Sequence, residues 1–375
     1  MLQTYPLFLT EEKIRCISLA GYNPIGVFLR NSSVRSLYWA KICFLSILMF
    51  TCSWPISSKE LEPIYPIRGT FIQLLENSHG QWSENEWVTF FSYLKKLNIS
   101  DLYLQWTVAD TRSFFYSSTF QTVESPPLET ILRLAEQFEI KVNIGLVYDY
   151  EYWNQINNNS DRVKIYLEEL LIRSKLAAEQ IKSIAINYKS FKGWYITEEV
   201  DDINWKLDDK RELLFSYLER LSDALEKLTP GYQIAISGFC NGQIQITEFK
   251  KFWDQLFKRT KINLALFQDG IGTNKLTFSN LPYYLAAFKK SAIDNQREMG
   301  VIVEIFRQVD GYPINKKEFH AVPAELFRIN WQRQMASKFS HNIVAFSIPN
   351  YMMPIAGSSG NALYNKYLED IEKEN

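Results

Sequence analysis

Cysteine and histidine are both scarce in this chain of 375 residues. The four cysteines are Cys16, Cys43, Cys52 and Cys240, and the three histidines are His79, His320 and His341. The cysteines have neither the spacing of a zinc site nor the density of a disulfide scaffold. The scattered histidines disfavour a histidine-rich metal centre. We therefore expect no metal and no cofactor, and any catalysis must depend on carboxylates.

The chain also lacks an excess of charge of either sign. Its 41 basic and 42 acidic residues give a formal net charge of -1, and no dense stripe of lysine and arginine is visible. Nucleic acid is therefore not an expected partner. Aromatic residues, in contrast, make up 15% of the chain. Their rings fill protein cores, but they also stack on the C–H faces of sugars, which is a weak indication of a carbohydrate partner.

The N-terminal region reads as a targeting segment. Arg35 and Lys41 precede the apolar run 42–50, and small and polar residues follow it, which is the order of a secretory signal. The run is shorter than the roughly 20 residues of a spanning helix, although residues 37–54 together could form a marginal anchor. We therefore assign residues 1–56 to a leader with a signal peptide or signal anchor, and expect a periplasmic or secreted protein.

Two details of this leader have alternatives. Its length before Val34 suggests that translation begins near Val34, whereas a short cytoplasmic segment before a signal anchor is the other reading. Thr51-Cys52-Ser53 offers a small-x-small pattern for signal cleavage. Lipidation of Cys52 would require a small residue in place of Phe50.

After a linker at 57–66, residues 67–375 show short β-rich runs that alternate with amphipathic stretches, which predicts βα units around a parallel sheet. The expected strands begin near Gly69, Asp101, Lys141, Gly193, Tyr232, Ile262, Val301 and Asn342. Helix signals lie between them, such as the capping box of Ser83 and Glu86. Eight units predict a single (β/α)8 barrel, a TIM barrel. A doubly wound sheet, the alternative, would require a glycine-rich phosphate turn that the sequence lacks.

Two glutamates stand out at the ends of predicted strands, where the active sites of such barrels lie. In the fourth strand, Trp194 and Ile196 are apolar enough to face the helices. The two-residue period of a strand then turns Tyr195 and Glu199 toward the barrel interior. Glu198 is expected to point outward or into a loop.

The seventh strand follows the same reasoning. Val301, Val303 and Ile305 form its helix-facing set, which leaves Glu304 inside the barrel. An inward carboxylate is costly unless it is hydrogen bonded or has a chemical role. Cleavage of a glycosidic bond needs such a pair, about 5 Å apart in a retaining enzyme. We predict Glu199 as acid/base and Glu304 as nucleophile; the alternative is a structural carboxylate paired with Arg307 or a lysine.

Other polar residues close the predicted strands and could line a pocket: Gln73, Gln105, Asn143, Asp149, Ser237, Asn241, Gln268, Asp269 and Ser347. Several aromatic residues near them could stack on sugars: Trp106, Tyr148, Trp153, Tyr195, Trp205 and Tyr351. Trp106 and Trp153 are the best candidates because they follow strand ends. For each of them, a place in the core is the alternative.

Four blocks in order, GTFIQ at 69–73, LYLQW at 102–106, GWYITEEVDD at 193–202 and FQDGIG at 267–272, carry a resemblance to a known family. Through them the chain resembles the domain of unknown function 4434 family, glycoside-hydrolase-like barrels of exported bacterial proteins. The likeness covers most of residues 66–350. It implies substrate-binding roles for residues in these blocks: Gln73, Gln105, Trp106, Tyr195, Gln268 and Asp269. It also implicates Glu199.

Larger clans of retaining glycosidases with this fold place the acid/base after strand four and the nucleophile after strand seven. Those enzymes usually have Asn-Glu at the acid/base, whereas this chain has Glu198-Glu199. The difference is compatible with another proton-relay partner, with an inverting reaction, or with a barrel that binds glycan without cutting it.

Three functions follow as hypotheses. The first is a glycoside hydrolase that acts on an extracytoplasmic polysaccharide or envelope glycan, with Asp149 and Trp153 also among its substrate-binding residues. The second is a glycan-binding or polysaccharide-assembly protein without catalysis. The third is a metal-dependent hydrolase, which would need Asp149, Asp201, Asp202 and Asp269 to converge, with calcium as the metal that oxygen ligands favour. A membrane is expected as a partner only through the N-terminal anchor.

Overall fold

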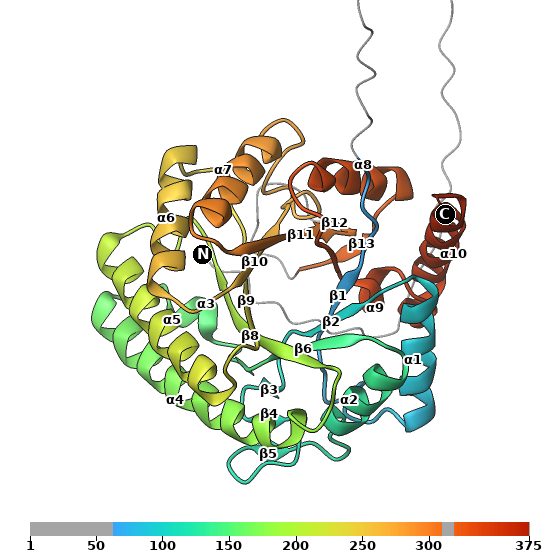
Figure 1. The fold of residues 1–375 in the computed structure, drawn as a ribbon, viewed down its shortest axis with the longest axis horizontal. Helices are drawn as coiled ribbons and strands as arrows, with labels where there is room; N and C mark the ends of the chain where they lie inside the picture. The colour runs from blue at the N-terminus through green and yellow to red at the C-terminus, as the bar shows by residue number, and fades with distance from the viewer. Residues whose placement is uncertain (1–62, 310–318, 375) are drawn as a thin grey trace, which may run out of the picture. The chain divides into compact units, whose positions relative to one another are not determined.

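The computed structural model describes residues 63–309 and 319–374 and confirms the (β/α)8 barrel (Figure 1). The predicted leader and residues 57–62 of the predicted linker lie outside the described residues. Parallel strands close in the order β1-β14-β11-β10-β9-β8-β6-β2. In chain order they are β1 (Gly69–Ile72), β2 (Asp101–Leu104), β6 (Lys141–Gly145), β8 (Phe191–Val200), β9 (Gln233–Gly238), β10 (Leu264–Gln268), β11 (Glu298–Glu304) and β14 (Ile343–Phe346). The largest difference from prediction is in the seventh strand, which begins at Glu298 rather than near Val301.

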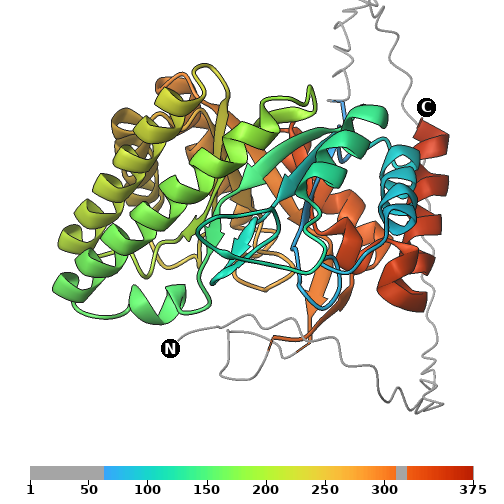
Figure 2. The same ribbon diagram turned by 90° about the horizontal axis from the view of Figure 1, so that it is seen from below.

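A long helix follows each barrel strand in the chain, and these helices surround the strands in both ribbon views (Figures 1 and 2). They are α1 (Glu84–Lys96), α2 (Leu128–Gln137), α4 (Ser160–Ala185), α5 (Asp208–Leu228), α6 (Ile246–Arg259), α7 (Leu281–Asp294), α8 (Leu326–Ser337) and α10 (Gly357–Glu374). Shorter helices are α3 (Tyr152–Gln155), α9 (Ile348–Tyr351) and the 3-10 turn Pro354–Ala356. The predicted capping box is present, since the Ser83 backbone N–H donates to Glu86 Oε2 at 2.7 Å. Among the described residues, no helix is both long and apolar enough to cross a membrane.

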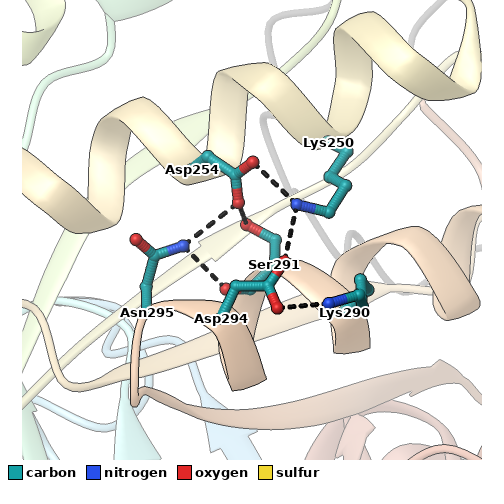
Figure 3. Close-up of polar contacts among 6 residues, drawn as sticks. All are labelled: Lys250, Asp254, Lys290, Ser291, Asp294 and Asn295. Carbon is teal, nitrogen blue, oxygen red and sulfur yellow. Dashed lines mark hydrogen bonds and ion pairs between the residues drawn. The ribbon is translucent and has the colours of Figure 1, made fainter.

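A polar network joins α6 to α7 on the outside of the barrel (Figure 3). The Asp254 carboxylate accepts hydrogen bonds from Lys250 Nζ at 2.8 Å and from Ser291 Oγ at 2.7 Å. Asn295 Nδ2 donates to the same carboxylate at 3.1 Å, and Lys250 also pairs with Asp294 at 3.0 Å. The network fixes the spacing of two neighbouring helices and lies outside the strand barrel.

Ring closure connects the two ends of the described chain. β1 pairs with β14 through Gly69 with Val344 and Thr70 with Ala345. The Thr70 hydroxyl also accepts a hydrogen bond from the Ile348 backbone N–H at 2.9 Å. Outside the strands, α1 and α10 lie side by side (Figures 1 and 2), and the rings of Tyr93 and Tyr364 meet at 5.4 Å between centroids.

Two small sheets were not predicted. One has the order β5-β4-β3-β7, with β3 (Val108–Ala109), β4 (Arg112–Ser113), β5 (Gln121–Thr122) and β7 (Val147–Tyr148). The other pairs β12 (Phe306–Gln308) with β13 (Ala321–Pro323). Strands of two or three residues are too short to show a period in the sequence. Both sheets are built from segments that follow barrel strands.

Candidate active site

Side chains inside the barrel confirm the predicted alternation. A buried interior cluster is formed by Phe71, Tyr103, Tyr195, Ala235, Leu264, Leu266, Ile302 and Val344. Trp194, Ile196, Val301 and Val303 belong instead to the cluster between strands and helices. Further along the same strands, toward their C-terminal ends, stand Gln73, Gln105, Glu199, Gln268 and Glu304. This end of the barrel, called the mouth below, is where the sites of (β/α)8 enzymes lie.

Glu199 points across the mouth from β8. Its Oε1 accepts a hydrogen bond at 2.7 Å from Nε2 of Gln268 on β10, two strands away in the barrel order. Its backbone carbonyl accepts a hydrogen bond from the Tyr152 hydroxyl at 3.1 Å. Burial raises the pKa of Glu199 above its ordinary value, against the opposing effects of the Lys275 charge and the Gln268 hydrogen bond. The nearby charge of Glu304 raises it further.

Glu304 is more buried, at 2% exposure, and more strongly hydrogen bonded. Its Oε2 accepts from the Thr273 backbone N–H at 2.8 Å and from the Thr273 hydroxyl at 3.2 Å. Burial raises the pKa of Glu304, whereas the Lys275 charge and the bonds from Thr273 oppose that rise. Hydrogen bonds to a carboxylate favour its ionised form.

Gly272 makes this contact possible. An added Cβ at position 272 would lie 2.5 Å from the Phe306 carbonyl oxygen and 2.8 Å from Glu304 Cβ. The loop after β10 therefore packs its backbone directly on Glu304, because residue 272 has no side chain. The next residue, Thr273, then supplies the two donors.

A second buried carboxylate supports Glu304 from behind. Asp269 Oδ2 accepts from Gln332 Nε2 on α8 at 2.6 Å, and its Oδ1 accepts from the Ile271 backbone N–H at 3.1 Å. Burial, together with the charge of Glu304, raises the pKa of Asp269 to about 7. Arg328 donates to the Glu304 backbone carbonyl at 3.0 Å. Both oxygens of Asp269 are thus hydrogen bonded within the protein, next to Glu304. The resemblance had implied that Asp269 binds substrate.

Lys275 is the buried cation of this region. It lies at 7% exposure, with Nζ 3.4 Å from the centroid of the Phe239 ring. Within the described ranges, neither Glu199 nor Glu304 forms an ion pair with a lysine or arginine side chain. Arg307, the predicted alternative partner of Glu304, is exposed. The predicted partner Arg307 therefore forms no ion pair with Glu304, whereas the charge of Lys275 acts on both glutamates.

Glu198 points away from the mouth, as the strand alternation predicts. Its Oε2 accepts a hydrogen bond at 2.9 Å from the hydroxyl of Tyr217 on α5. Burial raises the pKa of Glu198 to about 7, although the Tyr217 bond acts in the opposite direction. The Glu198-Glu199 pair thus separates into one residue behind the strand and one in the mouth.

Sequence comparison identifies the family. The family described as "Domain of unknown function (DUF4434)" matches residues 67–358, more than half of the chain. The chain belongs to this family. A relative from Escherichia coli K12, described as the uncharacterized protein YbcH, is 27% identical over 235 residues, which cover 62% of this chain and 74% of that protein.

Solved structures place this DUF4434 barrel among folds of glycoside hydrolases. A candidate α-L-fucosidase from Bacteroides thetaiotaomicron VPI-5482 superposes with a TM-score of 0.64 at 19% identity, covering 82% of this chain and 94% of that one. A β-galactosidase from Marinomonas ef1 gives a TM-score of 0.51 at 9% identity, covering 81% of this chain and 59% of that one. At these identities the likeness establishes the fold alone.

Several predicted substrate-binding residues of the DUF4434 barrel already have partners. Asp149 accepts from Arg173 at 2.9 Å and from the Glu151 backbone N–H at 2.8 Å. Tyr195 lies inside the barrel, where its hydroxyl is 2.7 Å from Ser237 Oγ. These contacts hold the scaffold, and they leave Asp149 and Tyr195 little capacity to bind a ligand.

The predicted aromatic platforms differ in the same way. Trp106 is buried, donates Nε1 to the Leu74 carbonyl at 2.8 Å and is stacked on Tyr148 at 4.4 Å. Tyr148 is half-buried, so it presents more of its ring than Trp106. Trp153 is buried and lies 6.0 Å from the Phe239 ring. Of the family-implied residues, Gln73 and Gln105 stand out, because each has a buried side-chain oxygen without a hydrogen-bond partner in the described chain.

The carboxylates proposed for a metal site do not converge. Asp201 accepts from the backbone and side chain of Asn204, and Asp202 from the backbone and side chain of Asn241. Asp149 and Asp269 have the separate partners given above. Within residues 63–309 and 319–374, no group of three His, Cys, Asp or Glu side chains is arranged to hold a metal ion. The hypothesis of a metal centre built from these four aspartates is therefore wrong.

Four residues of the site lie outside the predicted strand ends. Thr273 and Lys275 lie in the loop after β10, several residues beyond the strand end at Gln268. Gln332 and Arg328 lie on α8. A search confined to strand ends cannot find them, although the FQDGIG block ends immediately before Thr273.

Proposed function

We propose that this protein is a retaining glycoside hydrolase that cleaves O-glycosyl bonds in a polysaccharide or envelope glycan outside the cytoplasm. The observation that carries the proposal is the pair of inward carboxylates, Glu199 at the end of the fourth barrel strand and Glu304 at the end of the seventh. In addition to burial, the charge of Glu304 raises the pKa of both Glu199 and Asp269. Perturbed carboxyl pKa values of this kind are common in active sites. The extracytoplasmic location rests on the leader sequence alone.

The hydrogen bonds support the assignment of roles. Glu304 accepts two donors from Thr273, which favour an ionised nucleophile that attacks the anomeric carbon. Glu199 accepts a single amide hydrogen bond, and burial favours its protonated form. A protonated Glu199 can donate its proton to the leaving oxygen and then, as a carboxylate, take a proton from the attacking water.

The neighbouring amides suit a carbohydrate. Gln73 and Gln105 hold buried oxygens without partners in the described chain, at the same end of the barrel as the two glutamates. Sugar hydroxyls are donors that such oxygens can accept. Tyr148 adds a half-buried ring near Glu199. Burial raises the pKa of Tyr148, and the charge of Glu199 raises it further.

The test replaces each carboxylate by its amide. Glu304→Gln and Glu199→Gln should each lower kcat/KM on a cleaved glycan by about 1000-fold or more. Glu198→Gln is the matched control, because Glu198 is on the same strand but points outward, and it should keep wild-type turnover. Equal turnover of all three variants and wild type would remove both assignments.

Chemical rescue separates the two roles. With an activated aryl glycoside as substrate, azide can replace the missing carboxylate of Glu304→Gly and attack the anomeric carbon, which gives a glycosyl azide of inverted configuration. In Glu199→Ala, azide attacks the glycosyl-enzyme instead and gives a product of retained configuration. The opposite pattern of products would exchange the two roles.

A second candidate, a glycan-binding protein without catalysis, is favoured by the deep burial of Glu304 and its hydrogen bonds with Thr273. It predicts binding without product on prolonged incubation. It also predicts that Glu304→Gln leaves affinity unchanged.

A further inference from the structure

Lys275 has an unusual position for a lysine. The loop that carries it is closed by the Lys275 backbone N–H, which donates to the Gly270 carbonyl at 2.9 Å. The same loop contacts Glu304 through Gly272 and Thr273. The side chain then reaches Phe239, which follows β9 at the mouth, and ends 3.4 Å from the centre of that ring. The ammonium group is thus held inside the site, between the loop and the aromatic ring.

The ammonium has no direct acceptor in the described chain. No hydrogen bond or ion pair joins its Nζ to a described residue. Burial lowers its pKa, and the charges of four nearby carboxylates oppose that lowering: Glu304, Glu199, Asp201 and Asp202. The Phe239 ring covers one side of the cation, but a ring face does not replace hydrogen-bond acceptors. Burying a lysine to 7% exposure without acceptors for its three N–H donors costs free energy, unless a ligand supplies an acceptor.

The other cation of the site differs in this respect. Arg328 donates to the backbone carbonyls of Glu304 and Phe306, so its role is to hold the chain. The uncharged donors and acceptors of the mouth, Gln73, Gln105 and Gln268, are sufficient for neutral hydroxyls. A buried positive charge beside them adds recognition of a negative charge.

We propose that Lys275 binds the carboxylate of an acidic sugar, so that the glycan taken by this site contains uronic acid or another carboxylated residue. The inference rests on the proposed function for the location of the sugar, but it concerns binding and not bond cleavage. An ammonium is a compact point charge that suits a single carboxylate oxygen. A carboxylate placed there would supply the missing acceptor.

Binding is measured by calorimetry with the full chain. The probes are oligosaccharides of polygalacturonate, alginate and hyaluronan, each paired with its carboxyl-reduced counterpart, which has the same linkages and no charge. At least one acidic probe should bind about 30-fold more tightly than its reduced form. Lys275→Met, which keeps most of the aliphatic length, should bring that ratio close to one. Lys275→Arg, which keeps the charge, should retain part of it.

Lys206→Met is the matched control, because Lys206 is an exposed lysine in the loop after β8. It should leave the ratio unchanged, and thermal unfolding verifies that each variant is folded. The proposal is overturned if no acidic probe binds better than its reduced form, or if the preference persists in Lys275→Met. A shifted pH profile with an unchanged binding ratio also overturns it, since Lys275 would then act only on the glutamates.

The two proposals fail separately. Acidic probes that bind through Lys275 but are never cleaved would refute the hydrolase and leave this inference intact. Cleavage of neutral glycans with no preference for acidic ones would support the hydrolase and refute the role of Lys275 in binding a carboxylate.

Discussion

Replacing Gly272 by alanine is expected to displace Glu304 without unfolding the barrel. The new Cβ would lie 2.5 Å from the Phe306 carbonyl oxygen, 2.8 Å from Glu304 Cβ and 3.0 Å from Glu304 Oε2. Carbon contacts are ordinarily about 3.5 Å or longer, so the groups around position 272 must separate by about 1 Å. The displacement falls on Glu304 and on the loop that supplies Thr273.

The magnitude follows from these contacts. Overpacking of this kind costs about 1–3 kcal/mol of stability, which a barrel of this size can tolerate. A misplacement of about 1 Å in a catalytic group costs about 100-fold in rate. Gly272→Ala should therefore lose about 100-fold in kcat on a cleaved glycan while remaining folded.

Urea unfolding and steady-state kinetics on the same preparation test this expectation. Gly231→Ala is the control: Gly231 has a φ of +80° and nothing within 4 Å of an added Cβ, and it precedes β9 at the opposite end of the barrel. Alanine there should cost about 1–2 kcal/mol through backbone strain and leave kcat unchanged. Wild-type kcat in Gly272→Ala, or an equal loss of kcat in both variants, would refute the reasoning.

Two further predictions concern stability and pH. Burial raises the pKa of Glu198 to about 7, so the folded state holds a proton that the unfolded chain loses above about pH 4.5, and wild-type stability should fall between pH 4.5 and 7. Glu198→Gln should remove the share of that fall that Glu198 contributes, and gain on the order of 3 kcal/mol over wild type at pH 7.5, measured by urea unfolding. The raised pKa of Asp269 leaves a smaller fall in the variant, and a slope equal to that of wild type would contradict the prediction. Burial alone would raise the pKa of Asp254, but hydrogen bonds from Lys250 and Ser291 hold that pKa below its ordinary value. The contribution of Asp254 to stability is therefore present above pH 3.8 and is lost as pH falls below that value. Asp254→Asn should lower the free energy of unfolding by about 1–2 kcal/mol at pH 7 and by less at pH 3. Glu248→Gln, at an exposed position of the same helix, should lower it little. Equal losses in Asp254→Asn at both pH values would count against a stabilising role of the network of Figure 3.

The barrel strands could be predicted because each has a strong local signal. Along β8 and β11, residues that face the helices alternate with residues that face the barrel interior. The directions of the Glu199 and Glu304 side chains therefore follow from the two-residue period of a strand. The same rule places Glu198 outside, where it meets Tyr217. Local pattern is thus sufficient for side chains that belong to a barrel strand.

The remainder of the site depends on contacts between distant segments. Lys275 reaches Phe239 only because the loop after β10 folds back on itself at Gly270, which has a φ of +65°. Gln332 meets Asp269 from a helix 63 positions later in the chain. Asp149 had the right position for a ligand contact but is held by Arg173, a pairing that strand pattern does not contain.

The closure of the ring also determines when the site can exist during synthesis. Glu304 is paired in register with Phe346 of β14, and β14 in turn pairs with β1 near the start of the barrel. A nascent chain that has emerged only as far as β11 therefore carries both glutamates but lacks one of the two neighbours of the strand that holds Glu304. Glu304 therefore gains the second neighbour of its strand only after β14 has been made, so products that end before β14 should present no complete pair of mouth carboxylates.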